Sequence, residues 1–191
     1  MEQQRCPWAR SELEIAYHDK EWGRPERDDG KLFEMIILEG MQAGVSWSVI
    51  LNKRENMRVA FDGFDVLKLA RYEQVKEAEL LSNPGILRNR AKVGALAKNA
   101  AAFLKVRDEF GSFSKYLWAF VDDRPIVNYW ERPEDIPAST ELSTALSRDL
   151  IKRGFKFVGP VICYAYMQAV GLVNDHLVSC PQHGICRDME G

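Results

Sequence analysis

The chain is poor in histidine and cysteine. Its 191 residues include three histidines and four cysteines. Cys6 and His18 lie near the N-terminus, whereas His176 and Cys180 lie near the C-terminus. Two cysteines and two histidines are the donor set of a tetrahedral zinc site, and the H-x3-C spacing predicts a helical turn with both side chains on one face. A metal bound by all four would join the two ends and close a very long loop.

The C-terminal region offers rival ligands for such a metal. Cys180, His183 and Cys186 form a C-x2-H-x2-C cluster that can hold an ion locally, and Cys163 is a fourth thiol. In a third interpretation the cysteines are unligated core residues and the histidines lie at the surface. The spacing alone leaves all three interpretations open.

Long apolar runs and a secretion signal are also absent. No run approaches the roughly 18 apolar residues that a membrane span requires. The N-terminus lacks the basic start and apolar core of a signal peptide. Four cysteines in an unsecreted chain favour thiols or metal ligands over disulfides. With 46% hydrophobic and 28% charged residues, the sequence predicts one globular domain over residues 1–191, cytoplasmic and not associated with membranes.

The chain also lacks an excess of basic residues. Its formal net charge is −2, which argues against a general polyanion binder but allows a local basic face. Two clusters are candidates for such a face, one with Arg88, Arg90, Lys92 and Lys98 and one with Lys152, Arg153 and Lys156. Solvated helix faces and phosphate-binding surfaces are equally consistent with these clusters.

Strand alternation, internal repeats and low-complexity tracts are absent, and helical periodicity dominates. Helices are predicted over residues 31–41, 47–61, 66–81, 86–110, 112–121, 139–153 and 159–171. Asp65, Ser112 and either Ser139 or Thr140 are expected to cap helices. Gly154 is the expected stop of one helix, and Pro160 lies in the first turn of the next. Residues 122–140 are predicted to form a loop, and the fold class is all-α.

Glu39 is an unusual carboxylate. It follows Ile36, Ile37 and Leu38, where a surface glutamate is ordinary but a buried one is costly unless paired. Small residues follow it, and the aromatic side chains of Trp8, Tyr17, Trp22 and Trp47 flank it in the sequence. Aromatic residues in this pattern usually belong to a core. Alternatively, rings and a carboxylate together suit a flat ligand that is cationic or donates N–H groups.

The segment GFKFVGP, residues 154–160, separates two predicted helices. Gly154 and Gly159 leave backbone N–H groups free at a helix N-terminus, and Lys156 adds positive charge. This combination favours a phosphate-binding turn. A glycine-containing corner between helices is also a common structural element.

Three segments together resemble a known family. AYHDKEWG, LFEMIILEGMQAGVSW and GFKFVGPVICYAYMQAVGLVNDH, together with the Cys6, His18, His176 and Cys180 set, are closely similar to bacterial 3-methyladenine DNA glycosylase I. The resemblance extends from Cys6 to Cys180. It implies an α-helical fold of the helix-hairpin-helix glycosylase superfamily. It also implies one structural zinc held by those four residues, with Cys163, His183 and Cys186 excluded as ligands.

The resemblance further implies a base-excision enzyme. Such an enzyme flips 3-methyladenine out of alkylated double-stranded DNA and hydrolyses its glycosidic bond without cutting the strand, as a monomer that releases the free base. Glu39 would recognise the base, Tyr17 and Trp47 would contact it, and Trp8 and Trp22 would line the pocket. Gln42, Gly44 and Val45 would fill the gap left in the duplex, and Gly154, Lys156 and Gly159 would belong to the DNA-binding hairpin.

Two positions depart from related patterns. Glu14 stands where the family often has an aromatic residue, and Asn174 stands where many superfamily members have a catalytic aspartate. Two alternative functions compete with base excision. One is a non-catalytic DNA-binding module joined by zinc. The other is a zinc hydrolase with three protein ligands and Asp19, Glu21 or Asp175 as its general base.

Overall fold

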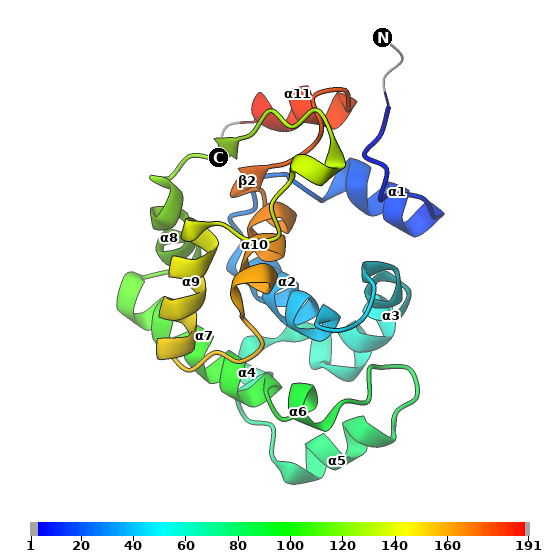
Figure 1. Ribbon diagram of the computed structural model, residues 1–191. Helices are drawn as coiled ribbons and strands as arrows, with labels where there is room; N and C mark the ends of the chain where they lie inside the picture. The colour runs from blue at the N-terminus through cyan, green and yellow to red at the C-terminus, as the bar shows by residue number, and fades with distance from the viewer. Residues whose placement is uncertain (1–3, 190–191) are drawn as a thin grey trace.

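The computed structural model describes residues 4–189, so the outermost residues of the expected 1–191 domain, 1–3 and 190–191, lie outside the described range. Helices form most of the described chain, which confirms the all-α prediction (Figure 1). The N-terminal half contains α1 (Glu12–Lys20), α2 (Asp29–Gln42), α3 (Trp47–Ala60), α4 (Val66–Leu69), α5 (Gln74–Ser82) and α6 (Arg90–Val93). The C-terminal half contains α7 (Leu96–Phe110), α8 (Phe113–Trp118), α9 (Glu141–Lys152), α10 (Pro160–Ala169) and α11 (Pro181–Arg187). Three short 3-10 helices span Asp62–Phe64, Ala119–Val121 and Pro133–Asp135.

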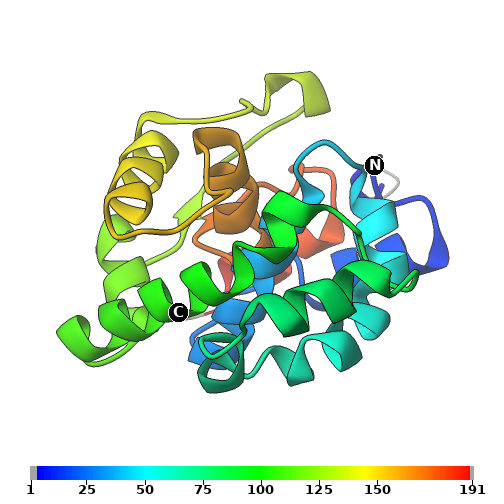
Figure 2. The ribbon, with the colours of Figure 1, turned by 90° about the horizontal axis from the view of Figure 1, so that it is seen from below.

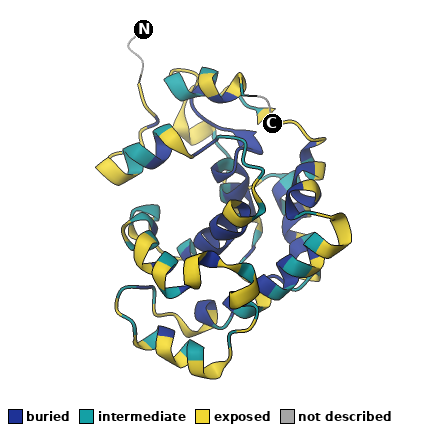
Figure 3. Cartoon of the chain, turned by 180° about the vertical axis from the view of Figure 1, so that it is seen from behind, coloured by how far each residue is buried: buried dark blue, intermediate teal, exposed yellow. Residues whose placement is uncertain are grey.

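Helix α2 forms the centre of the core. Every residue from Leu32 to Met41 is buried, Glu39 included, because α3, α7, α8 and α10 all pack against this helix. Buried residues accordingly concentrate on the inner helices, while the outer helices alternate between buried and exposed positions (Figure 3). Phe33 of α2 packs edge-on against Phe103 of α7, with ring centroids 4.9 Å apart. Helix α2 thus holds Glu39 on a rigid, fully packed element.

Capping residues were predicted well. Asp65 accepts hydrogen bonds from the N–H groups of Leu67 and Lys68, and Ser112 accepts one from Lys115. Thr140, rather than Ser139, caps α9 and forms a capping box with Ser143. These short polar side chains satisfy N–H groups that a helix start leaves without intrahelical partners.

Two predicted helices are each broken into two. The 66–81 prediction fails at Ala70–Glu73, where a turn between α4 and α5 lets the Tyr72 hydroxyl donate a 2.5 Å hydrogen bond to Asp62. The 86–110 prediction fails in a similar way. Asn89 caps the short α6, and the chain breaks at Gly94 before α7 begins. Glycine has low helix propensity, so the periodic pattern does not continue through this position.

The long connection between α8 and α9 is not entirely irregular. Residues Ile126–Val127 form β1, which pairs in parallel with β2, Val173–Asn174, so the expectation of no strand was wrong for these residues. The pairing includes hydrogen bonds from Ile126 N–H to the Leu172 carbonyl and from Asn128 N–H to the Asn174 carbonyl. A two-residue strand is too short for a periodic signal. This small sheet fixes the connection beside the segment that follows α10.

The N-terminal segment lies beside the segment that leads into α11. Helices α1 and α11 are neighbours at one end of the molecule, although they are far apart in sequence (Figure 1). The Gln4 N–H donates to the carbonyl of Ser179 at 3.2 Å. In the view from below, α7 lies on the side of the molecule that faces the viewer, away from α1 and α11 (Figure 2). Among the described residues, no helix combines the length and apolar character needed to cross a membrane.

Candidate functional site: an aromatic pocket beside a Cys/His cluster

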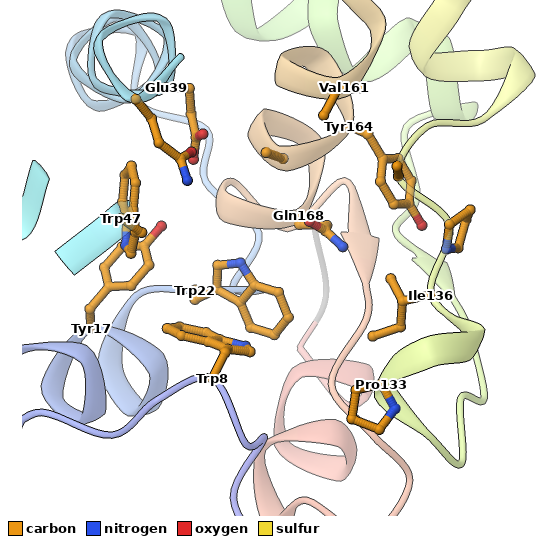
Figure 4. A pocket seen from close by; sticks show the side chains of 14 residues that line it. Trp8, Tyr17, Trp22, Glu39, Trp47, Pro133, Ile136, Val161, Tyr164 and Gln168 are labelled. Carbon is orange, nitrogen blue, oxygen red and sulfur yellow. The ribbon is translucent and has the colours of Figure 1, made fainter. Parts of the chain in front are cut away.

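A cavity of about 440 Å³ brings together all five of the predicted pocket residues. Tyr17 comes from α1, Glu39 from α2 and Trp47 from the first position of α3. Trp8 and Trp22 flank α1, so the three tryptophans and the tyrosine surround one side of the cavity (Figure 4). The ring centroids of Tyr17 and Trp47 are 5.1 Å apart, and those of Trp8 and Trp22 are 5.2 Å apart.

Glu39 reaches this cavity as a buried and incompletely paired carboxyl group. Its side chain is 3% exposed, and its Oε2 atom has no hydrogen-bond partner within the described residues. Burial raises the pKa of Glu39 from 4.5 to about 8, because the charged form is poorly solvated there. Trp47 Nε1 is a second buried atom without a partner among the described residues, at the same cavity. Unpaired buried polar atoms are rare in folded proteins, and a ligand with complementary polar atoms would satisfy them.

The Tyr17 hydroxyl has only a weak protein partner. It donates a 3.8 Å contact to the sulfur of Met35. Burial, together with the nearby Glu39, raises the pKa of Tyr17 well above its usual value, so this phenol keeps its proton. Tyr17 and Glu39 therefore offer the cavity a donor and an acceptor, respectively.

Sequence reasoning missed the opposite wall of the cavity. That wall is formed by Pro133, Ile136, Pro137 and Ala138 of the α8–α9 connection and by Val161, Tyr164, Ala165 and Gln168 of α10. The α10 residues recur at positions i, i+3, i+4 and i+7, the spacing of one helix face. That spacing is present in the sequence, but on its own it indicates only a buried helix. Glu14 is not among the lining residues, because its Oε2 accepts hydrogen bonds from the N–H groups of Arg10 and Ser11 at the start of α1.

The four predicted metal ligands converge close to the cavity. Cys6, His18, His176 and Cys180 are all buried, and their ligand atoms lie within 4.8 Å of one another. His18 Nε2 lies 3.2 Å from His176 Nδ1, and both nitrogens lie within 3.8 Å of the Cys180 sulfur. This group has the composition and spacing to hold a metal ion. The predicted helical turn at 176–180 is wrong, however, because the segment is a loop that turns through a Cys180 N–H to Leu177 carbonyl hydrogen bond.

Hydrogen bonds orient both histidines of this cluster. His18 Nδ1 lies 2.7 Å from Asp19 Oδ1, and Arg5 in turn holds the Asp19 carboxylate through two contacts. His176 Nε2 lies 3.1 Å from the Trp22 carbonyl. These contacts leave His18 Nε2 and His176 Nδ1 facing the cluster, as outer partners do in metal sites. The packing is close enough to require glycine at position 23, since a Cβ there would lie 2.8 Å from His176 Nε2.

The rival ligands have other partners. His183 Nε2 contacts the Asn128 carbonyl at 2.8 Å, and Cys163 donates to the Val158 carbonyl at 3.2 Å. Cys186 is buried, which raises the pKa of its thiol to about 11, and it is not part of the four-residue group. The C-x2-H-x2-C alternative therefore fails because these side chains point to different neighbours.

The turn between α9 and α10 packs directly against the helix that carries Glu39. Gly40 of α2 approaches Phe157 of the turn so closely that a Cβ on Gly40 would lie 3.4 Å from the Phe157 Cβ. Asn99 of α7 fixes the backbone of Lys156 by donating to its carbonyl and accepting from its N–H. Gly154 has φ of +104°, and Gly159 starts α10 without a side-chain cap. The first N–H groups of α10 thus remain available to an outside acceptor.

The loop after α2 borders the cavity. Gln42, the last residue of α2, lines it, and Gly44 has φ of +81° with open space around its Cα. Val45 is 38% exposed although it is apolar. Buried Lys92 supports this loop by donating hydrogen bonds to the carbonyls of Met41 and Ala43, at 2.7 and 2.5 Å. Lys92 is therefore part of the fold, and Arg153 of the second basic cluster pairs with Glu109 and Asp149.

Comparisons with known proteins identify relatives that match nearly the whole chain. The DNA-3-methyladenine glycosylase of Haemophilus influenzae is 49% identical over 93% of this chain and 96% of its own length. DNA-3-methyladenine glycosylase 1 of Escherichia coli is also 49% identical, over 93% of this chain and 95% of its own. The structure of 3-methyladenine DNA glycosylase I from Staphylococcus aureus, solved to explain 3-methyladenine recognition, superimposes with a TM-score of 0.92 at 35% identity, covering 96% and 98% of the two chains.

These likenesses place the protein among the glycosidases. Residues 8–183 match the methyladenine glycosylase family model, and the chain belongs to that family. The matched range contains the whole aromatic pocket, Glu39 and the α9–α10 turn. It also contains three of the four cluster residues, with Cys6 just outside it.

Proposed function

We propose that this protein excises 3-methyladenine from alkylated double-stranded DNA by flipping the base into the aromatic pocket and hydrolysing its glycosidic bond. The observation that carries the proposal is the buried Glu39 carboxyl group, unpaired at Oε2 within the described residues, facing a cavity lined by Tyr17 and Trp47. An enzyme that acts on a base in a duplex must extrude it first. The recognition of 3-methyladenine by the S. aureus relative supports this choice of base.

The pocket suits a cationic purine. Methylation at N3 gives adenine a positive charge, which aromatic faces and a carboxylate both attract. In the free protein Glu39 holds its proton near neutral pH, since burial raises its pKa to about 8. A cationic base would favour the ionised form of Glu39 and would pair with that carboxylate. A neutral base would leave Glu39 without that partner.

Catalysis then follows from binding the departing base. The C1′–N9 bond breaks and its electron pair leaves with the base, which becomes neutral. A water oxygen bonds to C1′ of the sugar, and that water releases one proton to solvent. A cationic base is a good leaving group, so the enzyme gains rate by binding the transition state more tightly than the substrate. No lysine lines the described cavity, so we expect hydrolysis without a Schiff base and without strand cleavage.

We assign DNA binding to the two backbone segments next to the pocket. The α9–α10 turn, with Gly154, Lys156 and Gly159, would act as a helix-hairpin-helix element that receives a phosphate at the start of α10. Lys156 is exposed and its backbone is fixed by Asn99. Gln42, Gly44 and Val45 would enter the duplex where the base has left, which accounts for an apolar side chain held in solvent.

We infer that the four-residue cluster binds one structural zinc. Tetrahedral bonds of about 2.0–2.1 Å to nitrogen and about 2.3 Å to sulfur imply ligand-to-ligand distances of about 3.3–3.8 Å. Four of the distances between cluster atoms run from 3.2 to 3.8 Å, in agreement with that geometry. Four protein ligands leave no position for a reacting water, so the ion would hold structure. This disfavours a zinc hydrolase, and Asp19 is already held by His18 and Arg5.

The proposed function predicts a defined pair of products. Incubation of the purified protein with N-methylated DNA should release free 3-methyladenine, measured by chromatography, and leave abasic sites in intact strands. Breaks that appear without added base would contradict the proposed hydrolysis. Binding to DNA without release of any base would instead support the non-catalytic DNA-binding module, which has no use for an unpaired Glu39.

A further inference from the structure

Asp175 is a fully buried carboxylate that receives four side-chain hydrogen bonds. Asn128 Nδ2 and Trp130 Nε1 each donate to its Oδ1 atom at 2.7 Å. The Tyr164 hydroxyl donates to Oδ2 at 2.6 Å, and Gln168 Nε2 donates to the same oxygen at 2.8 Å. All four partners therefore turn a donor hydrogen toward Asp175.

Two of these partners line the pocket. Tyr164 and Gln168 lie on the side away from Tyr17 and Trp47 (Figure 4). Gln168 donates one N–H of its amide to Asp175, which fixes the orientation of the amide and leaves Oε1 as its acceptor for a ligand. Burial and the hydrogen bond to Asp175 raise the pKa of Tyr164 above its usual value, and the phenol keeps the proton that it donates. The lone pairs of the Tyr164 hydroxyl oxygen then remain as acceptors for a ligand.

The other two partners hold the rest of this wall. Asn128 and Trp130 belong to the connection that also supplies Pro133 and Ile136 to the cavity. Pairing of β1 with β2 brings this connection beside Asp175. One carboxylate therefore joins the connection to α10 and sets the direction of the polar groups on α10.

We propose that Asp175 is a positioning residue that holds Tyr164 and Gln168 so that the α10 wall of the pocket presents hydrogen-bond acceptors to the bound nucleotide. This inference rests on the proposed function. A wall of acceptors favours the positive charge that an alkylated nucleotide carries before and during bond cleavage. It disfavours neutral bases that present carbonyl oxygens, because two acceptors would then face each other.

Asp175→Asn tests the inference because it reverses this arrangement with little change in size. The indole N–H of Trp130 cannot reverse, so the carbonyl of the new side-chain amide is expected to stay with it. The NH2 group of that amide then faces Tyr164 and Gln168, the Gln168 amide turns over, and donors enter the pocket. We expect the single-turnover rate of 3-methyladenine release to fall about tenfold or more. The half-saturating DNA concentration and the zinc content should change less than about twofold, because the DNA-binding segments and the metal ligands are intact.

Two amide variants keep the test decisive even if Asp175→Asn folds poorly. Gln168→Met removes one amide donor from the same carboxylate inside the pocket, whereas Gln74→Met makes the same substitution at an exposed position on α5, outside the pocket. We expect Gln168→Met to slow release by about three- to tenfold and Gln74→Met by less than about twofold. Equal effects of the two, or an unchanged rate in both Asp175→Asn and Gln168→Met, would overturn the positioning role. A wild-type protein that releases no 3-methyladenine would instead refute the proposed function.

Discussion

Burial of the Glu39 carboxyl group in the free protein costs free energy. A carboxyl group on a buried helix normally gains a cation or several N–H donors, but the Oε2 atom of this residue has neither among the described residues. The sequence already identified the residue, because an acidic side chain interrupts an otherwise apolar run between Ile36 and Met41. Its isolation was not predictable, since it depends on which side chains of α1 and α3 surround it. A site that is strained when empty gains affinity when a matching ligand arrives.

This cost predicts a pH-dependent stability difference. The pKa of Glu39 is raised from 4.5 to about 8 in the folded state, so its contribution to stability is fully present below pH 4.5 and is lost as the pH rises through 8. Glu39→Gln cannot ionise and should escape this loss. As the pH rises from 4.5 through the folded-state pKa of about 8, its free energy of unfolding should therefore gain roughly 3–5 kcal/mol relative to that of the wild type. Urea unfolding of both proteins at several pH values measures the difference. Parallel stability curves would show that Glu39 is not isolated in solution.

At the scale of elements, local signals predicted helices and their capping residues better than the breaks within them. Asp65, Ser112 and Thr140 start helices where expected, because caps act through neighbouring backbone groups. The loop at 176–180 depends on distant partners instead, and tertiary contacts add to the low helix propensity of Gly94 at the break before α7. Lys92 turns inward to the end of α2, and His176 turns toward His18. Such tertiary contacts override periodicity and are invisible in one sequence.

The support that Lys92 gives to the 43–46 loop leads to a second prediction. Lys92→Met leaves the carbonyls of Met41 and Ala43 without their donor, at a cost of about 1–3 kcal/mol for each buried group. We expect a lower melting temperature and about tenfold weaker binding to DNA that contains an abasic-site analogue. Fluorescence anisotropy measures the binding. Lys105→Met removes the same charge from an exposed position on α7 and should bind nearly as the wild type does; equal losses would point to charge rather than loop support.

On the scale of the whole molecule, the metal cluster and the pocket form one unit. His18 follows Tyr17 in α1, and the rings of Trp22 and His176 pack edge to face with centroids 4.6 Å apart. A metal at the cluster would therefore brace the aromatic wall of the pocket. The sequence predicted that these four residues could form one group, and the structure brings them together; the spacing had left other groupings open. It did not predict the α10 wall, which depends on how α10 packs between α2 and α9.

The zinc assignment predicts both composition and stability. Purified protein should contain one zinc per chain, and Cys180→Ser should lose it. A metal that closes a loop of this length contributes on the order of 3–5 kcal/mol in a chain-entropy account. For a chain of this size the melting temperature should drop by about 10 °C. Cys163→Ser makes the same substitution at a thiol outside the cluster and should retain the metal; full zinc content in Cys180→Ser would contradict the assignment.

The central claim is that Glu39 recognises the flipped base. Its most direct test is the single-turnover rate of 3-methyladenine release from methylated DNA by the wild type and by Glu39→Gln, at equal zinc content. Glu55→Gln, at an exposed position on α3, serves as the matched control. We predict a loss of about a hundredfold for Glu39→Gln, typical of a lost charged contact at a reacting group, and an unchanged rate for Glu55→Gln. Release by Glu39→Gln at the wild-type rate would contradict the claim.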